Sequence, residues 1–466
     1  MAATAEAPPR PGGDGMAMPD RIWAIVALSF GTALTVVDGT IPNVGLPAIA
    51  RELGVGLGTV TGIVTFYQLV LVMGLLPFSS LGERYGLRRI YQSGQIIFGI
   101  ASLMILLAHS FWVLLLLRGA QALGAAMALS VASALLRQIY PTRHLGSGLG
   151  LNSVIVASSN ALAPTLGGLI ISHFDWRLVF VAAAPLAVVS LLLGRALPDP
   201  APTTRHFDWK SGLWSAAGVL GLIGGVELGV EGHMPLPGMI VCAGGVALIT
   251  MLVRHEKRRA APVFPVDLLG HKVILLSTLG AIAGFVASSA LVVALPFRFE
   301  RVMHMSPEAA GLAMTPFPLT MLVIAPLSGW LSDRVSAAWL GMAGMAIAVA
   351  GLLLVAFMPA DAGHLGVVWR LMTCALGFGL FFSPNARMII GTSPRARAAA
   401  AGGLIATGRL FGQTLGAALV GVLLSFGVGL GPVPLLAGAC LAALAGIASG
   451  FRGGGVGARG DMVAEQ

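Results

Sequence analysis

Charged residues are scarce in this sequence, and that scarcity decides its broad class. Asp, Glu, Lys and Arg make up only 10% of the 466 residues, whereas 56% are hydrophobic. Soluble domains carry roughly 25% charged residues, so the composition excludes a soluble globular enzyme. The mean hydropathy is +0.89, and apolar runs long enough to cross a bilayer follow one another. We therefore predict an all-α integral membrane protein.

Cysteine is also scarce, and the common signatures of a catalytic site are missing. The three cysteines, Cys242, Cys374 and Cys440, lie far apart within apolar runs, which predicts packing roles and no disulfide or metal site. The sequence contains no zinc-protease, serine-hydrolase or phosphate-binding glycine motif, and no connection long enough for a soluble domain. We expect neither an enzyme nor a bound cofactor.

Basic residues outnumber acidic ones, but their distribution favours membrane topology over nucleic-acid binding. With both termini cytoplasmic, 21 of the 28 Lys and Arg residues lie in cytoplasmic segments, four lie outside and three lie within spans. This bias is typical of a multi-pass protein of the plasma (bacterial inner) membrane. The fourteen predicted spans are 22–48, 57–80, 90–108, 111–136, 147–172, 176–195, 211–230, 236–253, 273–297, 306–331, 338–358, 364–390, 400–425 and 430–451. Merging or dropping the seventh and eighth would give twelve.

Three short matches at an offset of about 250 residues indicate an internal repeat. "SSLGERYG" (79–86) matches "GWLSDRVS" (329–336), Arg118 matches Arg370, and "PTLGG" (164–168) matches "QTLGA" (413–417). Two related six-helix halves follow, with a transport site expected between them. The predicted units are a flexible cytoplasmic tail (1–20), an N-terminal half (21–196), a linker with two inserted helices and a basic cytoplasmic loop (197–272), a C-terminal half (273–452) and a second cytoplasmic tail (453–466).

Several motifs resemble those of the major facilitator superfamily, and within it the fourteen-helix drug:proton antiporters. "GWLSDRVS" is similar to G-x-x-x-D-R-x-G, "RGAQALGAA" to R-x-x-Q-G-x-G-A-A, and "SNALAPTLGGLI" to the antiporter pattern G-x-x-x-G-P-x-x-G-G. "VVDGTIPNVGLPAI" is similar to the helix-1 pattern of the drug antiporters. The resemblance covers roughly residues 20–452. It implies the major facilitator fold and transport driven by the proton gradient, without a cofactor.

Asp38 stands in the middle of the first apolar run, and Arg118 falls at a similar depth in the fourth. An ionised carboxylate at the bilayer centre costs about 2.5–3.5 kcal/mol, so such residues usually face a cavity and act in transport. Arginine stays charged in proteins, so any protonation must fall to Asp38. We predict that the two residues form the proton-coupling and substrate site. The alternatives are an Asp38 that caps a helix broken at "DGTIP" and an Arg118 that snorkels outward.

The remaining candidate residues have weaker signals. The resemblance implies that Glu83, Arg84, Arg88, Asp333 and Arg334 clamp the cytoplasmic ends of the bundle, although basic residues there also serve as topological anchors. It implies that Pro164, Gly167 and Gly168 pack the two halves together, with plain helix packing as the alternative. Glu227 is a possible second acid or an interfacial carboxylate. Side chains that could line a pocket or simply pack are Phe30, Tyr67, Met314, Phe317, Phe378 and Phe381.

The sequence therefore predicts a proton-driven exporter of lipophilic, cationic drugs that works by alternating access. The expected partners are the lipid bilayer, a drug-like small molecule and protons, with no nucleic acid, and the protein is expected to be a monomer. One alternative is an exporter of a neutral or anionic metabolite or antibiotic on the same fold. Another, from a different class, is a non-transporting membrane sensor.

Overall fold

The secondary structure of the computed structural model consists of helices throughout the residues it describes. These residues are 15–141, 145–199, 209–230, 234–256, 268–332, 334–393 and 398–453. Parts of both predicted tails and of the predicted linker lie outside these ranges. The helices are α1 (Asp20–Thr40), α2 (Pro42–Leu53), α3 (Leu57–Tyr85), α4 (Leu87–Met104), α5 (Phe111–Ile139), α6 (Leu145–His173), α7 (Leu178–Val181), α8 (Ala184–Leu193), α9 (Trp209–Val230), α10 (Pro235–Glu256), α11 (Lys272–Arg301), α12 (Pro307–Met314), α13 (Pro316–Leu331), α14 (Ala337–Ala356), α15 (His364–Thr392), α16 (Ala398–Ser425) and α17 (Val433–Gly453).

Twelve helical segments among the described residues are long and apolar enough to cross a membrane. The sequence predicted fourteen spans. The two that are not among the twelve, 147–172 and 211–230, correspond to α6 and α9, which are helical with 29 and 22 residues. The count of fourteen therefore stays a prediction.

Two of the predicted spans are each divided by a proline. The span predicted at 22–48 consists of α1 and α2, which meet at Ile41 and Pro42, and the span predicted at 306–331 consists of α12 and α13, which meet at Thr315 and Pro316. Proline has no backbone N–H to donate and its ring crowds the preceding turn, so the regular helical hydrogen bonding is interrupted there. Both interruptions lie beside the cavity described below.

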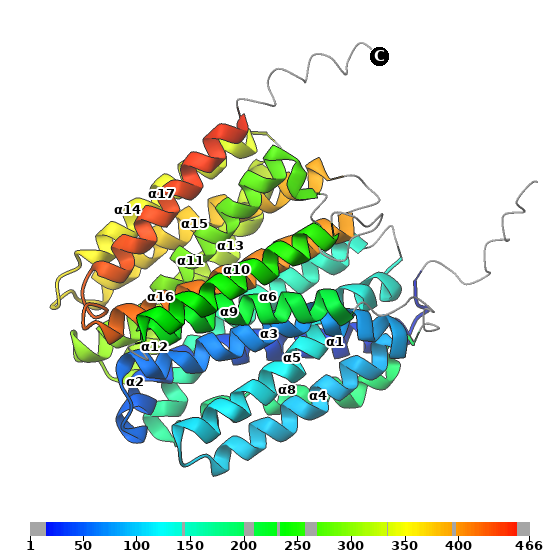
Figure 1. The fold of residues 1–466 in the computed structure, drawn as a ribbon, viewed down its shortest axis with the longest axis horizontal. Helices are drawn as coiled ribbons and strands as arrows, with labels where there is room; N and C mark the ends of the chain where they lie inside the picture. Colours follow the sequence, from blue (N-terminus) through cyan, green and yellow to red (C-terminus); the bar gives the residue numbers. More distant parts are fainter. Residues whose placement is uncertain are drawn as a thin grey trace, which may run out of the picture.

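The N-terminal helices (α1–α8) and the C-terminal helices (α11–α17) gather on different sides of the molecule, with blue to cyan on one side and yellow to red on the other (Figure 1). Contact between the two groups is made by α3 with α16, by α2 with α11, and by α6 with α12 and α13. A large core of buried side chains, including Leu291, Phe378 and Phe381, lies mainly among the C-terminal helices. A second core around Leu34, Tyr67 and Phe98 lies mainly among the N-terminal helices.

One end of the bundle, which we call the α2/α12 end, is held together by contacts between the two groups. α2 and α12 lie side by side there (Figure 1). Arg51 of α2 approaches Glu300 of α11, with Nη1 3.2 Å from Oε2. The hydroxyls of Thr165 in α6 and Thr315 between α12 and α13 share a hydrogen bond of 2.5 Å. At this end the N-terminal and C-terminal helices are therefore in direct contact.

α9 and α10 form an antiparallel pair that packs backbone to backbone. α9 also contacts α3 and α16, so the pair lies against the junction of the N-terminal and C-terminal helices. Gly218, Gly221 and Gly225 of α9 face Gly238 and Gly245 of α10. A Cβ atom added at Gly225 would lie 2.6 Å from the Cys242 backbone nitrogen. Small residues at such contacts let two membrane helices approach closely.

We predict that Gly225→Ala destabilises the protein, because the added methyl group has no room between the two backbones. Overpacking of this kind costs about 1–3 kcal/mol, which is measured as a lower midpoint of thermal unfolding in detergent. Gly244→Ala in α10 is the matched control, since no atom lies within 4 Å of the position a Cβ would take there. Equal unfolding midpoints for the two variants would contradict the close packing of α9 on α10.

Candidate functional site

A buried ion pair joins Asp38 of α1 to Arg118 of α5. The Arg118 Nη1 atom lies 2.9 Å from Asp38 Oδ1 and 3.0 Å from Oδ2. Both residues are almost completely inaccessible, with 0% of Asp38 and 1% of Arg118 exposed. Within the described part of the chain, no backbone N–H donates to the carboxylate. Asp38 therefore binds Arg118 and does not cap the interrupted helix.

Aromatic rings and a glutamine surround the Arg118 guanidinium. Its centre lies 4.1 Å from the centroid of the Tyr67 ring of α3 and 5.0 Å from that of Phe180 of α7. Nη1 also donates to Gln121 Oε1 at 2.7 Å, and Gln121 in turn donates to Ser102 of α4 and to the Phe180 carbonyl. Five helices thus converge on one cation, and cation–π contact in a dry site adds to the stabilisation of its charge.

A cavity of about 450 Å³ lies between the N-terminal and C-terminal helices. Gly39 and Thr40, which directly follow Asp38, line it, but Asp38 and Arg118 themselves do not. The ion pair is therefore separated from the cavity by about half a turn of α1. The residues that line the cavity are Gly39, Thr40, Asn43, Gln68, Asn152, Val156, Asn160, Pro164, Phe285, Ser288, Ser289, Leu291, Val292, Val293, Leu295, Met314, Phe317, Pro318, Met321, Ala325, Leu371, Phe382, Arg409 and Gln413.

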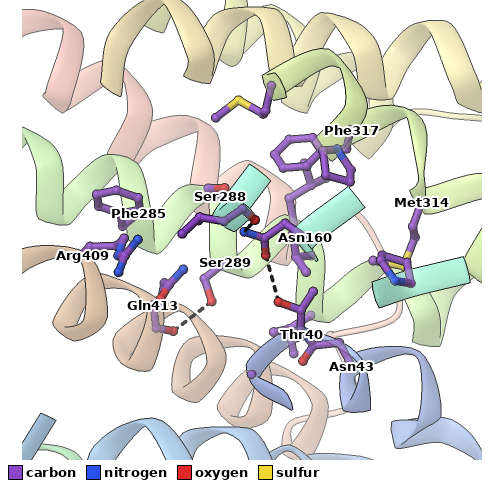
Figure 2. A pocket seen from close by; sticks show the side chains of 18 of the residues that line it. Thr40, Asn43, Asn160, Phe285, Ser288, Ser289, Met314, Phe317, Arg409 and Gln413 are labelled. Atoms are coloured by element: carbon purple, nitrogen blue, oxygen red, sulfur yellow. Dashed lines mark hydrogen bonds between the residues drawn. The ribbon is translucent and has the colours of Figure 1, made fainter. Parts of the chain in front are cut away.

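One wall of the cavity is a strip of α6. Asn152, Val156, Asn160 and Pro164 are spaced four residues apart, so they share one face of the helix. Thr40 of α1 donates to Asn160 Oδ1 at 2.9 Å, as Figure 2 shows. Two turns away, the Thr32 hydroxyl of α1 donates to Asn152 Oδ1 at 3.1 Å. The two bonds fasten α6 to the helix that carries Asp38.

The opposite wall combines one cation with polar and aromatic side chains. Arg409 and Gln413 lie one turn apart on α16 and face the cavity beside Phe285 of α11 (Figure 2). Ser289 of α11 donates to the Gln413 carbonyl at 2.8 Å and ties the two helices together. The Phe285 ring stacks on Phe382 of α15, with centroids 4.0 Å apart and planes 9° apart.

Two of the predicted pocket residues line the cavity and the others do not. Met314 and Phe317 are part of the wall, at the break between α12 and α13. Tyr67 lies against Arg118, and Phe378 is buried behind the wall with its ring 6.3 Å from that of Phe317. Phe381 is buried in the core of the C-terminal helices, and Phe30 of α1 does not reach the cavity.

The predicted loop residues lie at helix ends. Glu83 is in the last turn of α3, although its side chain is outside the described part, and Asp333 lies wholly outside it. Arg84 is exposed over the ring of Tyr85, at 5.5 Å from its centroid. Arg334 lies 3.6 Å from the centroid of the Trp330 ring. Among the described residues the structure brings neither arginine into an ion pair.

The remaining loop and linker candidates lie apart from the ion pair. Arg88 is a partly buried residue in the first turn of α4, after Gly86. Gly86 has φ +106°, a conformation that side chains disfavour, and it makes the turn between α3 and α4. Glu227 is a residue of α9, and its side chain is outside the described part.

The Pro164–Gly168 segment of α6 packs on both groups of helices. A Cβ atom at Gly168 would lie 2.7 Å from the Pro307 carbonyl oxygen at the start of α12, and one at Gly167 would lie 2.9 Å from that of Ile41. A Cβ atom at Gly311 of α12 would lie closer still to the Pro164 carbonyl oxygen. These contacts leave no room for larger side chains, so the segment joins the break in the first span to α12.

Sequence reasoning missed the cavity's polar side chains. Asn152 and Asn160 lie eight residues apart in a predicted membrane span. This spacing is visible in the sequence, but no functional site was predicted from it. Arg409 is one of the three arginines predicted within spans, but the sequence alone indicated no role for it. Arg370, the repeat counterpart of Arg118, donates to the Gly366 carbonyl and has no carboxylate partner in the described part of the chain.

Known proteins resemble this chain over nearly its whole length. An uncharacterized transporter, YebQ, of Escherichia coli is 38% identical over 95% of this chain and 98% of its own. The riboflavin transporter RibZ of Clostridioides difficile is 27% identical, covering 86% of this chain and 88% of its own. The multidrug resistance protein Stp of Mycobacterium tuberculosis is 27% identical over 87% of this chain and 76% of its own.

A solved structure and a family profile agree with these relatives. The crystal structure of a POT family transporter in complex with a thioalcohol-conjugated peptide covers 91% of this chain and 94% of its own, with a TM-score of 0.69 at 16% identity. Residues 28–296 and 276–453 each match the profile of the Major Facilitator Superfamily. The chain, a multi-pass membrane protein with an internal cavity between its N-terminal and C-terminal helices, belongs to the Major Facilitator Superfamily of transporters.

Proposed function

We propose that the protein is a proton-driven exporter of lipophilic organic molecules that works by alternating access between two six-helix halves. The observation that carries the proposal is the buried Asp38–Arg118 pair, which lies half a turn from the cavity lining. Ionisable residues inside a membrane are expensive to keep and usually act in ion or substrate movement. The fourteen-helix drug:proton antiporter subfamily is part of the same proposal.

The chemistry of the pair suggests how a proton changes the structure. Arg118 keeps its charge, so a proton bound at this site must reside on Asp38. Protonation removes the counter-charge of a buried guanidinium and weakens two hydrogen bonds of 2.9 and 3.0 Å. The interaction between α5 and α1 is then weaker. Because Thr40 of α1 bonds Asn160 of α6, a shift of α1 reaches the cavity wall directly.

The conformation supports an assignment as the inward-facing state. The positive-inside bias places Arg51 and Glu300 outside the cell and both termini inside, in the plasma (bacterial inner) membrane. The contacts of the α2/α12 end, Arg51–Glu300 and Thr165–Thr315, then close the external side of the cavity. In this proposal, Pro164, Gly167 and Gly168 help seal that side, while the Glu83–Arg88 and Asp333–Arg334 loops close the cytoplasmic side in the opposite state.

The charge of the cargo is not set by Asp38 in this state. The sequence favoured a cationic drug, since Asp38 is the acid placed most firmly at membrane depth. That carboxylate is occupied by Arg118, and no acid is among the residues that line the cavity. A multidrug resistance protein and a riboflavin transporter are both relatives, so drugs and metabolites each have a precedent in similar chains.

Asp38→Asn is expected to abolish transport driven by a proton gradient. The amide cannot exchange a proton, although it can still accept a hydrogen bond from Arg118. In vesicles loaded with ethidium, a cation, or with fluorescein, an anion, gradient-driven efflux of whichever dye the wild type exports should fall to the level of vesicles without the protein. Exchange of that dye, labelled for unlabelled, should persist without a gradient. Asp361→Asn, at an exposed position after α14, is the control.

Gradient-driven efflux by Asp38→Asn at the wild-type rate would refute the coupling role. Size-exclusion chromatography of both variants checks their folding, because loss of a partner from a buried ion pair can cost about 3–5 kcal/mol. A non-transporting sensor gives no efflux and no exchange even in the wild type. The same assay therefore separates the two classes of function.

A cross-link between positions 165 and 315 is expected to trap the protein and stop transport. The Thr165 and Thr315 hydroxyls are 2.5 Å apart in this state, and alternating access requires them to separate. Oxidation of the Thr165→Cys/Thr315→Cys variant should block efflux, and reduction should restore it. Each single cysteine variant serves as control. Full efflux by the quantitatively cross-linked protein would contradict opening at the α2/α12 end.

A further inference from the structure

Arg409 is a cation for which the described residues supply no partner. Its side chain lines the cavity from α16, and the buried Nε atom has no hydrogen-bond acceptor. Among the described residues, no carboxylate or carbonyl receives its guanidinium. By contrast, Arg118 binds Asp38, and Arg298 donates to two main-chain carbonyls at the end of α14 and just beyond it.

Among the described residues, the cavity lining supplies no negative charge to balance Arg409. The other described lining residues are apolar, hydroxyl or amide side chains, without Asp, Glu, Lys or a second Arg. Arg409 is only partly exposed, so water compensates its charge incompletely, and an opposite charge that enters the same space can pair with it. The electrostatics of this cavity therefore favour an anionic ligand over a cationic one.

Aromatic rings extend from the neighbourhood of Arg409 along the same wall. Phe285 stacks on Phe382 at 4.0 Å, and Phe382 lies parallel to Phe378 with centroids 5.8 Å apart. Phe378 itself lies behind the wall, and Phe317, which lines the cavity next to the α12–α13 break and meets the Phe378 ring at 71°, completes the strip. Planar ring systems bind well against such surfaces. Gln413, one turn from Arg409, adds a side-chain amide beside the guanidinium (Figure 2).

We propose that Arg409 is the anion-binding residue of the cavity and that the cargo is a planar aromatic molecule bearing a carboxylate. The carboxylate accepts two parallel hydrogen bonds from the Arg409 guanidinium, because the planar, forked arrangement of its N–H groups matches the two carboxylate oxygens. The ring system lies along Phe285, Phe382 and Phe317. The cavity volume of about 450 Å³ is within the range of drug-sized ligand sites. The assignment rests on the proposed function only in taking this cavity as the cargo site.

The test compares two fluorescent dyes that share a xanthene ring system but differ in charge. Fluorescein is an anion with a free carboxylate at mildly alkaline pH, whereas tetramethylrhodamine methyl ester is a cation with that carboxylate esterified. Binding of each dye to the purified protein is measured by fluorescence anisotropy without any proton gradient. We expect the wild type to bind fluorescein more tightly than the cationic ester.

Three variants separate charge recognition from folding. Arg409→Gln should weaken fluorescein binding by about 10–100-fold, the usual loss for a hydrogen-bonded charge, and leave the ester unchanged or improved. Arg409→Lys keeps the charge without the fork and should give an intermediate loss. Arg370→Gln, a second arginine within a span that does not line the cavity, should bind as the wild type does.

Three results would overturn the assignment: no binding of fluorescein by the folded wild type, tighter binding of the cationic ester, or unchanged fluorescein affinity in Arg409→Gln. None of them depends on proton coupling. Conversely, if Asp38→Asn supports gradient-driven efflux while the dye preference holds, the coupling proposal fails and the cargo assignment stands.

Discussion

The Asp38–Arg118 ion pair is the constraint on which the N-terminal helices depend. While Asp38 is ionised, the two opposite charges, 2.9 Å apart in a site without solvent access, stay paired, because either one alone would be strongly destabilised. Tyr67 and Phe180 cover the guanidinium from α3 and α7, and Gln121 carries its hydrogen bonding on to α4. The packing of these helices is thus organised around a charge as well as around apolar contact.

Two interrupted helical spans border the cavity, and residues next to the interruptions form part of its lining. Pro42 and Pro316 interrupt helical spans on either side, and residues next to both breaks, Thr40, Asn43, Met314 and Phe317, form parts of its lining. Discontinuous helices at mid-membrane are a common setting for transport sites. The ties from Thr32 and Thr40 to α6 then link the wall of the cavity to the helix that bears Asp38.

Much of the architecture could be read from the sequence, and the lining of the cavity could not. Hydropathy and charge bias depend on whole segments, so they indicated a multi-pass transporter, and the family match supports that. Counting residues from the span ends placed Asp38 and Arg118 at one depth, where the structure pairs them. A single sequence does not fix which face of a helix points inward. Tyr67 and Phe378 were therefore pocket candidates although they lie behind the wall, whereas Asn160 was not among the candidates and Arg409 had no assigned role.

Arg118 and Arg370 occupy matching positions in the predicted internal repeat but have different partners. Arg118 meets a carboxylate, whereas Arg370 bonds a carbonyl in its own helix, and the positions about 250 residues after Asp38, Ser288 to Ala290, contain no acid. The two matched positions therefore differ in charge. In the proposed mechanism the acid–base chemistry lies among the N-terminal helices, so the C-terminal helices, with Arg409 and the phenylalanine strip, can change to suit a different cargo without disturbing it.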